Sequence, residues 1–275
     1  MIEYLSKRIK TPFQYKVITA LDIRTKYLVA GQGTPVVLVH GAGAGAIAWF
    51  PLIDALSGEF SIIAPDVVGY GESDKPSASY SRYFFSSWLQ AFCDTLGINQ
   101  FVLVGHSMGG AVSLHFAMDN PDRVSQLVLI SPAGIGWSFP IPGLIYAIWF
   151  HCFPSIATSR KLLTHLVYHR NNLDDHFVRY ARDVCQTPGG SRVVWQGLGR
   201  FAIPLQHKQL EGIRQPTLVI WGEDDRIIPP SHGLRAVRTM PNAQLQLVPR
   251  AGHIPFFDEP ELVSQLILRF LLTSK

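Results

Sequence analysis

Val102–Gly110 reads Val-Leu-Val-Gly-His-Ser-Met-Gly-Gly, an apolar run that passes directly into a Gly-x-Ser-x-Gly pentapeptide. The apolar residues predict a buried strand, and the small residues after Ser107 predict the start of a helix. Such a strand–turn–helix junction is a nucleophile elbow, in which a sharp turn exposes the serine Oγ. Gly105 and Gly109 lack the Cβ atom that would clash where strand and helix approach each other. Ser107 is therefore the candidate nucleophile, although the pentapeptide alone also arises by chance at βα turns.

A serine nucleophile needs a base to take its proton and an acid to orient that base, and candidates for both follow Ser107 in the chain. Residues 217–221 are apolar and predict a buried parallel strand, which is followed by the acidic loop Gly222-Glu223-Asp224-Asp225. Residues 244–248 alternate polar and apolar side chains, as a strand near a sheet edge does, and Ala251-Gly252-His253 comes next. His253 is the candidate base, and the acidic loop offers three carboxylates for the acid.

Five motifs in this order make the chain resemble the α/β-hydrolase superfamily, in the branch that includes small carboxylesterases, C–C bond hydrolases and cofactor-free haloperoxidases. Besides the elbow, the matching pieces are His40-Gly41-Ala42-Gly43, the segment from Asp66 to Ser73, the acidic loop, and Gly252-His253. The resemblance covers nearly the whole chain. It implies a mostly parallel, eight-stranded α/β sheet with helices on both faces and an inserted helical cap.

The resemblance also assigns roles to individual residues. The family pattern Gly-x-x-Asp places the acid at Asp225, which leaves Asp224 as the alternative that would simply be solvated. It places the two oxyanion-hole donors at the backbone amides of Ala42 and Met108. Residues 46–49 supply neither the lysine nor the Ser or Thr that a phosphate-binding loop needs after its glycines, so we discount nucleotide binding.

The domain organisation follows from where the strand pattern is interrupted. Strand and helix patterns alternate up to residue 131, and residues 132–212 contain Gly, Pro and aromatic helical segments without a strand. We expect a first part of the core at residues 1–131, a helical cap insertion at 132–212 and a second part of the core at 213–275. The first cap helix, near residues 144–150, is apolar nearly all round but too short to span a bilayer. It packs on the core, lines an apolar pocket, or contacts lipid at an interface.

Substrate contacts are harder to read because one sequence fixes helix registers poorly. We take Trp195, Phe201 and Ile254 as candidates for the substrate pocket. C–C hydrolases of ring-fission products usually carry Asn before the nucleophile and Trp after the catalytic histidine, whereas this chain has His106 and Ile254. Four cap arginines could bind a substrate carboxylate or could simply be solvated; they are Arg179, Arg182, Arg192 and Arg200.

Composition limits the remaining possibilities. The 275 residues are 47% hydrophobic and carry a formal net charge of +4, which fits a globular protein and is too weak to indicate nucleic-acid binding. The ten histidines show no His-Glu-x-x-His or comparable cluster, so we expect neither a metal nor another cofactor. Three widely spaced cysteines indicate reduced thiols, and residues 1–8 lack the apolar core of a signal peptide. We therefore expect a cytoplasmic protein without a transmembrane segment, and a homodimer stays open.

The sequence as a whole favours a serine hydrolase with the triad Ser107, Asp225 and His253. We expect it to cleave small to medium, largely apolar carboxylic esters through an acyl-enzyme intermediate. A C–C bond hydrolase of ring-fission diketones and a perhydrolase would use the same motifs. A hydrolase-fold ligand receptor is the non-enzymatic alternative, and an epoxide hydrolase or dehalogenase is disfavoured because those relatives place Asp at the position of Ser107.

Overall fold

The computed structural model describes residues 2–137, 141–201 and 203–273, except for the side chains of residues 141, 142, 144 and 197–201. Eight strands form one sheet in the order β1-β2-β4-β3-β5-β6-β7-β8. The pairs β1–β2 and β2–β4 are antiparallel, and the other five pairs are parallel. The strands are β1 (Phe13–Ala20), β2 (Ile23–Ala30), β3 (Thr34–Val39), β4 (Phe60–Pro65), β5 (Phe101–His106), β6 (Val124–Ile130), β7 (Thr217–Gly222) and β8 (Ala243–Val248). The predicted fold class is confirmed.

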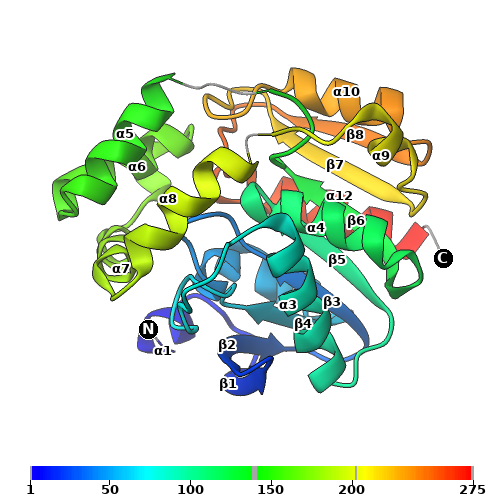
Figure 1. The fold of residues 1–275 in the computed structure, drawn as a ribbon, viewed down its shortest axis with the longest axis horizontal. Coiled ribbons are helices and arrows are strands. Elements are labelled where there is room, and N and C mark those ends of the chain that lie inside the picture. Colours follow the sequence, from blue (N-terminus) through cyan, green and yellow to red (C-terminus); the bar gives the residue numbers. More distant parts are fainter. Residues whose placement is uncertain (1, 138–140, 202, 274–275) are drawn as a thin grey trace.

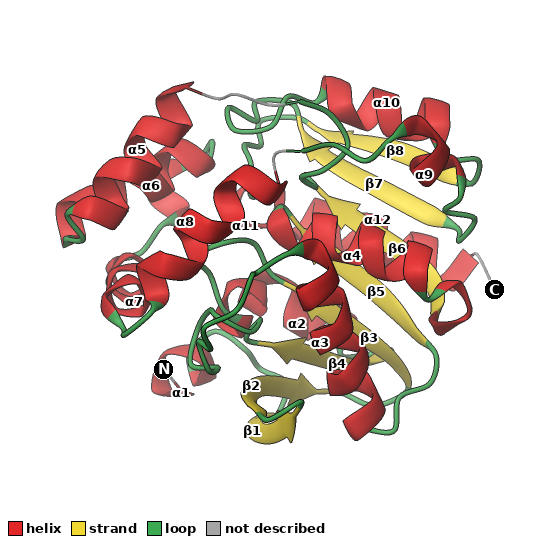
Figure 2. Cartoon of the chain, viewed as in Figure 1, coloured by secondary structure: helices red, strands yellow, loops and turns green. Residues whose placement is uncertain are grey.

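Helices cover both faces of this sheet (Figures 1 and 2). One face carries α1 (Ile2–Ser6), α2 (Phe50–Leu56) and α12 (Pro260–Thr273), and the other carries α3 (Arg82–Thr95), α4 (Met108–Asp119) and α10 (Ser231–Thr239). Successive strand residues point to opposite faces, so Val36 and Leu38 join the first core layer while Val37 and Val39 join the second. Every residue of β5 is buried, as expected for a central parallel strand covered on both faces.

The segment between β6 and β7 is helical; its helices α5–α8 stand to one side of the sheet in Figures 1 and 2, whereas α9 lies beside α10. It carries α5 (Ile141–Cys152), α6 (Ile156–Leu166), α7 (Asp175–Gln186), α8 (Gly190–Phe201) and α9 (His207–Glu211). Ser155 begins α6 with a capping box to Thr158, and the side chain of Asp174 caps α7 by accepting from the amide of Phe177. No strand occurs between β6 and β7 among the described residues. We call residues 132–212 the helical insertion.

Four short helical turns complete the described elements. They are η1 (Ala46–Trp49), η2 (Pro121–Arg123), η3 (Arg170–Asn172) and α11 (Pro255–Asp258). Trp49 of η1 stacks on Phe256 of α11, with ring centroids 5.0 Å apart. The loops after β3 and β8 are therefore packed against each other, and this contact brings together segments that lie about 200 residues apart in the chain.

Candidate active site

Ser107 lies in the turn between β5 and α4, and its backbone has φ 53° and ψ −117°. This positive φ is strained for a residue with a Cβ atom, and the surrounding structure must therefore hold it in place. The amide of Ser107 donates to the carbonyl of Ile130 at 3.0 Å. A Cβ at Gly105 would lie 2.5 Å from the carbonyl oxygen of Gly109, and one at Gly109 would overlap the carbonyl of Val39. Both glycines are thus required by close backbone approach.

His253 connects the serine to the acid. The Oγ–H of Ser107 donates to Nε2 of His253 at 2.9 Å, and Nδ1–H of His253 donates to Oδ2 of Asp225 at 2.8 Å. The side chains of His253 and Asp225 are 5% and 0% exposed, so this chain of hydrogen bonds is shielded from water. In this arrangement the lone pair of His253 Nε2 points at the hydroxyl group of Ser107 and can take its proton.

Asp225 accepts four hydrogen bonds, which explains why it carries a charge although it is buried. Its Oδ1 accepts from the amides of Ile227 and Ile228 at 2.8 and 3.0 Å, and its Oδ2 also accepts from Nε1 of Trp221 at 3.1 Å. Burial by itself would raise the pKa of Asp225, but His253 and these donors outweigh burial and lower that pKa below its ordinary value. Asp224 is exposed, so the structure places Asp225, and not its neighbour, against the histidine.

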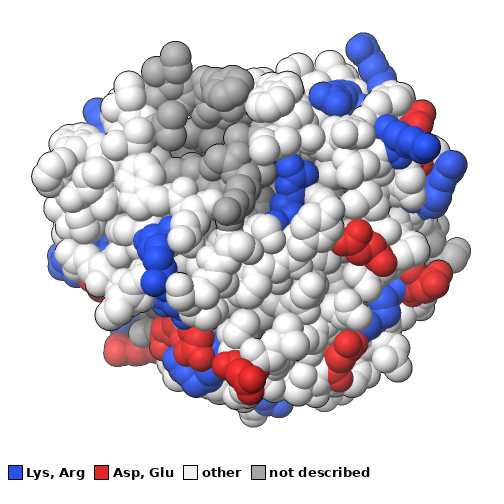
Figure 3. Space-filling view, viewed as in Figure 1, with Lys and Arg blue, Asp and Glu red and all other residues white. Residues whose placement is uncertain are grey.

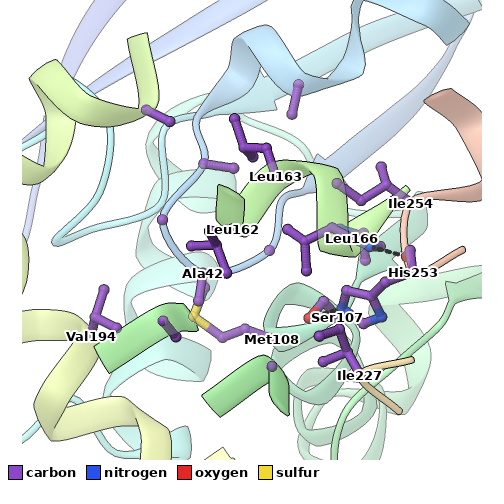
Figure 4. A pocket seen from close by; sticks show the side chains of 18 of the residues that line it. Ala42, Ser107, Met108, Leu162, Leu163, Leu166, Val194, Ile227, His253 and Ile254 are labelled. Carbon is purple, nitrogen blue, oxygen red and sulfur yellow. Dashed lines mark hydrogen bonds between the residues drawn. The ribbon is translucent and has the colours of Figure 1, made fainter. Parts of the chain in front are cut away.

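The turn after β3 approaches the elbow. His40 holds it, because Nδ1–H donates to the carbonyl of Gly41 at 2.8 Å and Nε2 accepts from the amide of Val67 at 2.9 Å. Burial lowers the pKa of His40 to about 4, so the ring is neutral, as this donor–acceptor pair requires. Ala42 and Met108 both line the cavity beside Ser107, and Figure 4 shows the Met108 side chain extending toward Ala42. The amide of Met108 opens α4 and has no acceptor within that helix.

Two further buried groups hold the loops around the site. Asp66 accepts from the amides of Ala46 and Glu72 at 2.6 and 2.7 Å, and burial raises its pKa to about 6. Nε2–H of His106 donates to the carbonyl of His253 at 2.9 Å. Burial, reinforced by His253, lowers the pKa of His106 to about 3, so His106 stays neutral. It is a positioning group for the backbone of the candidate base.

A cavity of about 470 Å³ opens from Ser107 toward the helical insertion (Figure 4). Its walls combine loops of the sheet with residues of α5, α6, α7 and α8. Apolar side chains dominate; they include Ala147, Phe150, Leu162, Leu163, Leu166, Phe177, Val194, Ile227, Ile254, Phe256 and Phe257. No Lys, Arg, Asp or Glu lines the cavity among the residues that the structure describes. The site therefore joins the candidate nucleophile to a chamber whose described lining is largely apolar and carries no charged side chain.

A family model described as alpha/beta hydrolase fold matches residues 34–260. The chain belongs to the α/β-hydrolase family. This α/β hydrolase is 31% identical over 265 residues to a 2-hydroxy-6-oxo-6-phenylhexa-2,4-dienoate hydrolase of Burkholderia cepacia, covering 88% of this chain and 89% of that protein. It is 33% identical over 271 residues to a 2-hydroxy-6-oxo-2,4-heptadienoate hydrolase of Pseudomonas putida, covering 93% and 95%. The solved 2-hydroxy-6-oxo-6-phenylhexa-2,4-dienoate hydrolase of Rhodococcus superposes with TM-score 0.88 at 25% identity, covering 96% and 100%.

The predicted pocket residues of this α/β hydrolase occupy different places. Ile254 lines the cavity. Trp195 is 42% exposed and does not line it, whereas the preceding residue of α8, Val194, does. The side chain of Phe201 lies outside the described part of the structure. The prediction chose the right helix in α8 but a side chain one position away, because a shift of one residue turns a helical side chain by about 100°.

Sequence reasoning missed the contribution of α6 and of the segment after His253. Leu162, Leu163 and Leu166 project from α6 into the cavity, and Phe256 and Phe257 follow the base. The leucines recur at i, i+1 and i+4, which is the spacing of one helical face, and this signal was available. The loop at the end of α6 also touches the base directly, since the carbonyl of Leu166 accepts from the amide of His253 at 2.7 Å.

None of the described cap arginines reaches the cavity of this α/β hydrolase. Arg179 is exposed, Arg182 pairs with the adjacent Asp183, and Arg192 donates to the carbonyl of Lys75 at 2.8 Å. The side chain of Arg200 lies outside the described residues. Within the described part of the chain, no group of three or more His, Cys, Asp or Glu side chains is placed to hold a metal ion.

Proposed function

We propose that this hydrolase cleaves small to medium, largely apolar carboxylic esters through an acyl-enzyme intermediate. The observation that carries the proposal is the cavity of about 470 Å³, whose described lining has no charged side chain and which opens directly onto Ser107. Apolar walls bind the hydrocarbon part of an ester because they remove its surface from water. Each methylene group placed in such a pocket contributes about 0.8 kcal/mol, which is roughly a fourfold gain in kcat/KM.

The chemistry follows from the hydrogen bonds of the site. Ser107 Oγ attacks the ester carbonyl while Nε2 of His253 takes its proton, and Asp225 stabilises the imidazolium that forms. The amides of Ala42 and Met108 are the donors that we assign to the oxyanion. His253 then protonates the leaving alcohol. A water molecule, deprotonated by the same histidine, attacks the acyl-enzyme and releases the carboxylic acid.

The helical insertion acts in this proposal as a cap over the acyl chamber. Its helices supply one wall of the cavity, and the carbonyl of Leu166 holds the amide of His253. Closing the chamber with apolar side chains excludes water from the oxyanion and strengthens its hydrogen bonds. Residues 132–212 are therefore the cap, between the two core parts 1–131 and 213–275.

A C–C bond hydrolase is the second candidate, because the relatives above are named as hydrolases of 2-hydroxy-6-oxo dienoates. Such dienoates carry a carboxylate, and burying a carboxylate without a partner costs several kcal/mol. No described Lys or Arg lines the chamber to pair with it. Because an ester carries no charge that needs a partner in the chamber, we rank ester hydrolysis above C–C bond cleavage.

The deciding experiment compares both substrate classes on the same protein. The mass of the intact protein is measured after incubation with a fluorophosphonate, and kcat/KM is measured for p-nitrophenyl esters from acetate to dodecanoate. The same measurement is made with 2-hydroxy-6-oxo-6-phenylhexa-2,4-dienoate, and Ser107→Ala is the control that removes the nucleophile without changing the cavity walls. We expect labelling and an ester kcat/KM at least about a hundredfold above that for the dienoate.

The opposite ranking would overturn the ester proposal in favour of C–C cleavage. Labelling at Ser107 with no turnover of either class would refute both and leave a ligand receptor, which stabilisation by a bound ligand without hydrolysis would then support. Full ester turnover by Ser107→Ala would remove Ser107 from the mechanism altogether.

A further inference from the structure

Helix α5 is apolar on two opposite faces. Its inner face lines the active-site cavity through Gly143, Ala147, Phe150 and His151. Its outer face, continued by the residue that follows the helix, carries exposed residues that we call the outer stripe: Ile145, Ile148, Trp149, Cys152 and Phe153. These positions recur at i, i+3, i+4, i+7 and i+8, so they lie together on one side of the helix. Trp149 and Phe153 are 46% and 68% exposed.

The tryptophans of the protein differ in exposure between the helical insertion and the rest of the chain. The three outside the helical insertion, Trp49, Trp88 and Trp221, are fully buried. The three inside it are 42% to 59% exposed; they are Trp137, Trp149 and Trp195. Trp195 of α8 lies beside the end of α5, since its ring and that of His151 have centroids 6.1 Å apart. Half-exposed tryptophans gathered on one segment are typical of residues that sit at a boundary between water and an apolar phase.

The net charge of the protein arises from the same segment. The helical insertion, residues 132–212, contains eight Lys and Arg and four Asp and Glu. It therefore accounts for the whole formal net charge of +4, and the remaining residues are balanced. Figure 3 shows a largely uncharged surface over α5, with Lys and Arg at its margins. Lys161 of α6 lies near α5, since its Nζ is 5.5 Å from the ring centroid of Tyr146.

We propose that the outer stripe, together with Trp195, docks on the surface of an anionic lipid bilayer. An apolar helix face with half-exposed tryptophans, on a segment of net positive charge, is the combination that favours a helix in the interfacial plane of an anionic membrane. The 12 residues of α5 extend about 18 Å, which is too short to span the bilayer. No helix within the described ranges is long and apolar enough to cross a membrane, so the contact lies along the surface.

The outer stripe lies on the helix that also lines the active-site cavity, so contact with a bilayer would place the cavity close to lipid. The inner face of α5 lines the cavity while the outer stripe would rest among the lipid headgroups, so one helix separates the bilayer from the acyl chamber. An apolar ester dissolved in the bilayer then reaches the chamber with less exposure to water. Binding to a bilayer can be measured without any hydrolysis. A failure of the docking proposal can therefore be told apart from a failure of the ester proposal on which its use rests.

The test is co-sedimentation of the full chain with vesicles. Vesicles of phosphatidylcholine alone are compared with vesicles that also contain phosphatidylglycerol, at low and high salt, and tryptophan emission is recorded in parallel. We expect binding to the anionic vesicles, a blue shift of emission, and loss of binding at high salt. The double variant Trp149→Gln/Phe153→Gln should bind about tenfold or more weakly, because two large apolar side chains no longer enter the interface.

A matched control removes two apolar side chains of similar exposure elsewhere. Val17 and Leu272 are 55% and 44% exposed and lie outside the helical insertion, and Val17→Gln/Leu272→Gln should bind as the wild type does. Circular dichroism and hydrolysis of a short soluble ester establish that both variants are folded. No binding of the wild type to anionic vesicles, or equal loss in both double variants, would overturn the proposal. So would light scattering that finds a wild-type dimer and a monomeric Trp149→Gln/Phe153→Gln variant, because the stripe would then be a contact between two copies of the chain.

Discussion

Replacing Asp225 with Asn tests the site most directly. The carboxylate accepts all of its hydrogen bonds, whereas an Asn side chain presents an NH2 donor in place of one oxygen. The Asn carbonyl oxygen can keep the two amide donors, Ile227 and Ile228, at the position of Oδ1. The Asn amide nitrogen then faces Nδ1 of His253 and Nε1–H of Trp221. His253 must accept at Nδ1 and carry its proton on Nε2, where it points at Ser107 and cannot take the hydroxyl proton.

We expect kcat to fall about 10³- to 10⁴-fold, as it does when a triad histidine is held in the wrong tautomer. This corresponds to roughly 4 to 5.5 kcal/mol of transition-state stabilisation. KM should change little, because Asp225 does not line the cavity. The fold should be retained at a cost of about 1 kcal/mol, since Trp221 keeps its second acceptor, the carbonyl of Ile228 at 3.0 Å.

The assay is steady-state hydrolysis of a p-nitrophenyl ester together with the rate of fluorophosphonate labelling. Asp224→Asn is the matched control, because it removes an exposed carboxylate from the same loop and should leave kcat unchanged. A loss of less than about tenfold in Asp225→Asn, or an equal loss in Asp224→Asn, would refute the assignment of the acid.

Three further changes test the chamber and its supports. Ala147→Phe should shift the optimal p-nitrophenyl ester to shorter acyl chains because Ala147 lines the cavity, whereas Ala157→Phe, on the exposed side of α6, should leave the profile unchanged. The pKa of His106 is lowered to about 3 from 6.5, so its contribution to stability is present above pH 6.5 and is lost as the pH falls toward 3. The free energy of unfolding, measured by urea denaturation, should therefore fall less steeply with decreasing pH in His106→Asn than in the wild type. Between pH 6.5 and pH 3 the two slopes should differ by up to about 1.4 kcal/mol per pH unit. Gly45→Ala should lower both activity and melting temperature because its Cβ would overlap a buried tyrosine hydroxyl, while Gly58→Ala, which meets only a carbonyl oxygen at 3.9 Å, should leave activity unchanged.

Much of the fold and the location of the reacting groups could be predicted from local sequence. An apolar run that ends in Gly-x-Ser-x-Gly specifies a strand, a turn and a helix within nine residues, because the glycines are needed wherever the backbone segments touch. The predicted fold class and family are confirmed. The structure brings Ser107, Asp225 and His253 into one hydrogen-bonded chain, and Asp225 is the carboxylate that the family spacing Gly-x-x-Asp had favoured over Asp224.

The pocket was less predictable because its side chains come from separate helices. Ile254 follows the base directly, so local sequence was enough to place it at the cavity. Trp195 is apolar and lies on α8, yet it faces outward, while Val194 faces the chamber. A helix that is apolar all round, such as α5, carries no signal for which side faces the cavity.

The sequence by itself determined the order of the strands along the chain, the candidate nucleophile and the glycines that its turn requires, because these depend on neighbours within a few positions. Only the tertiary structure decided that four helices of one insertion line a chamber beside Ser107, without a charged side chain in its described lining, and leave the outer stripe exposed. That outcome depends on how helices pack across long distances in the chain, and packing is set by the shapes of all the contacting faces together.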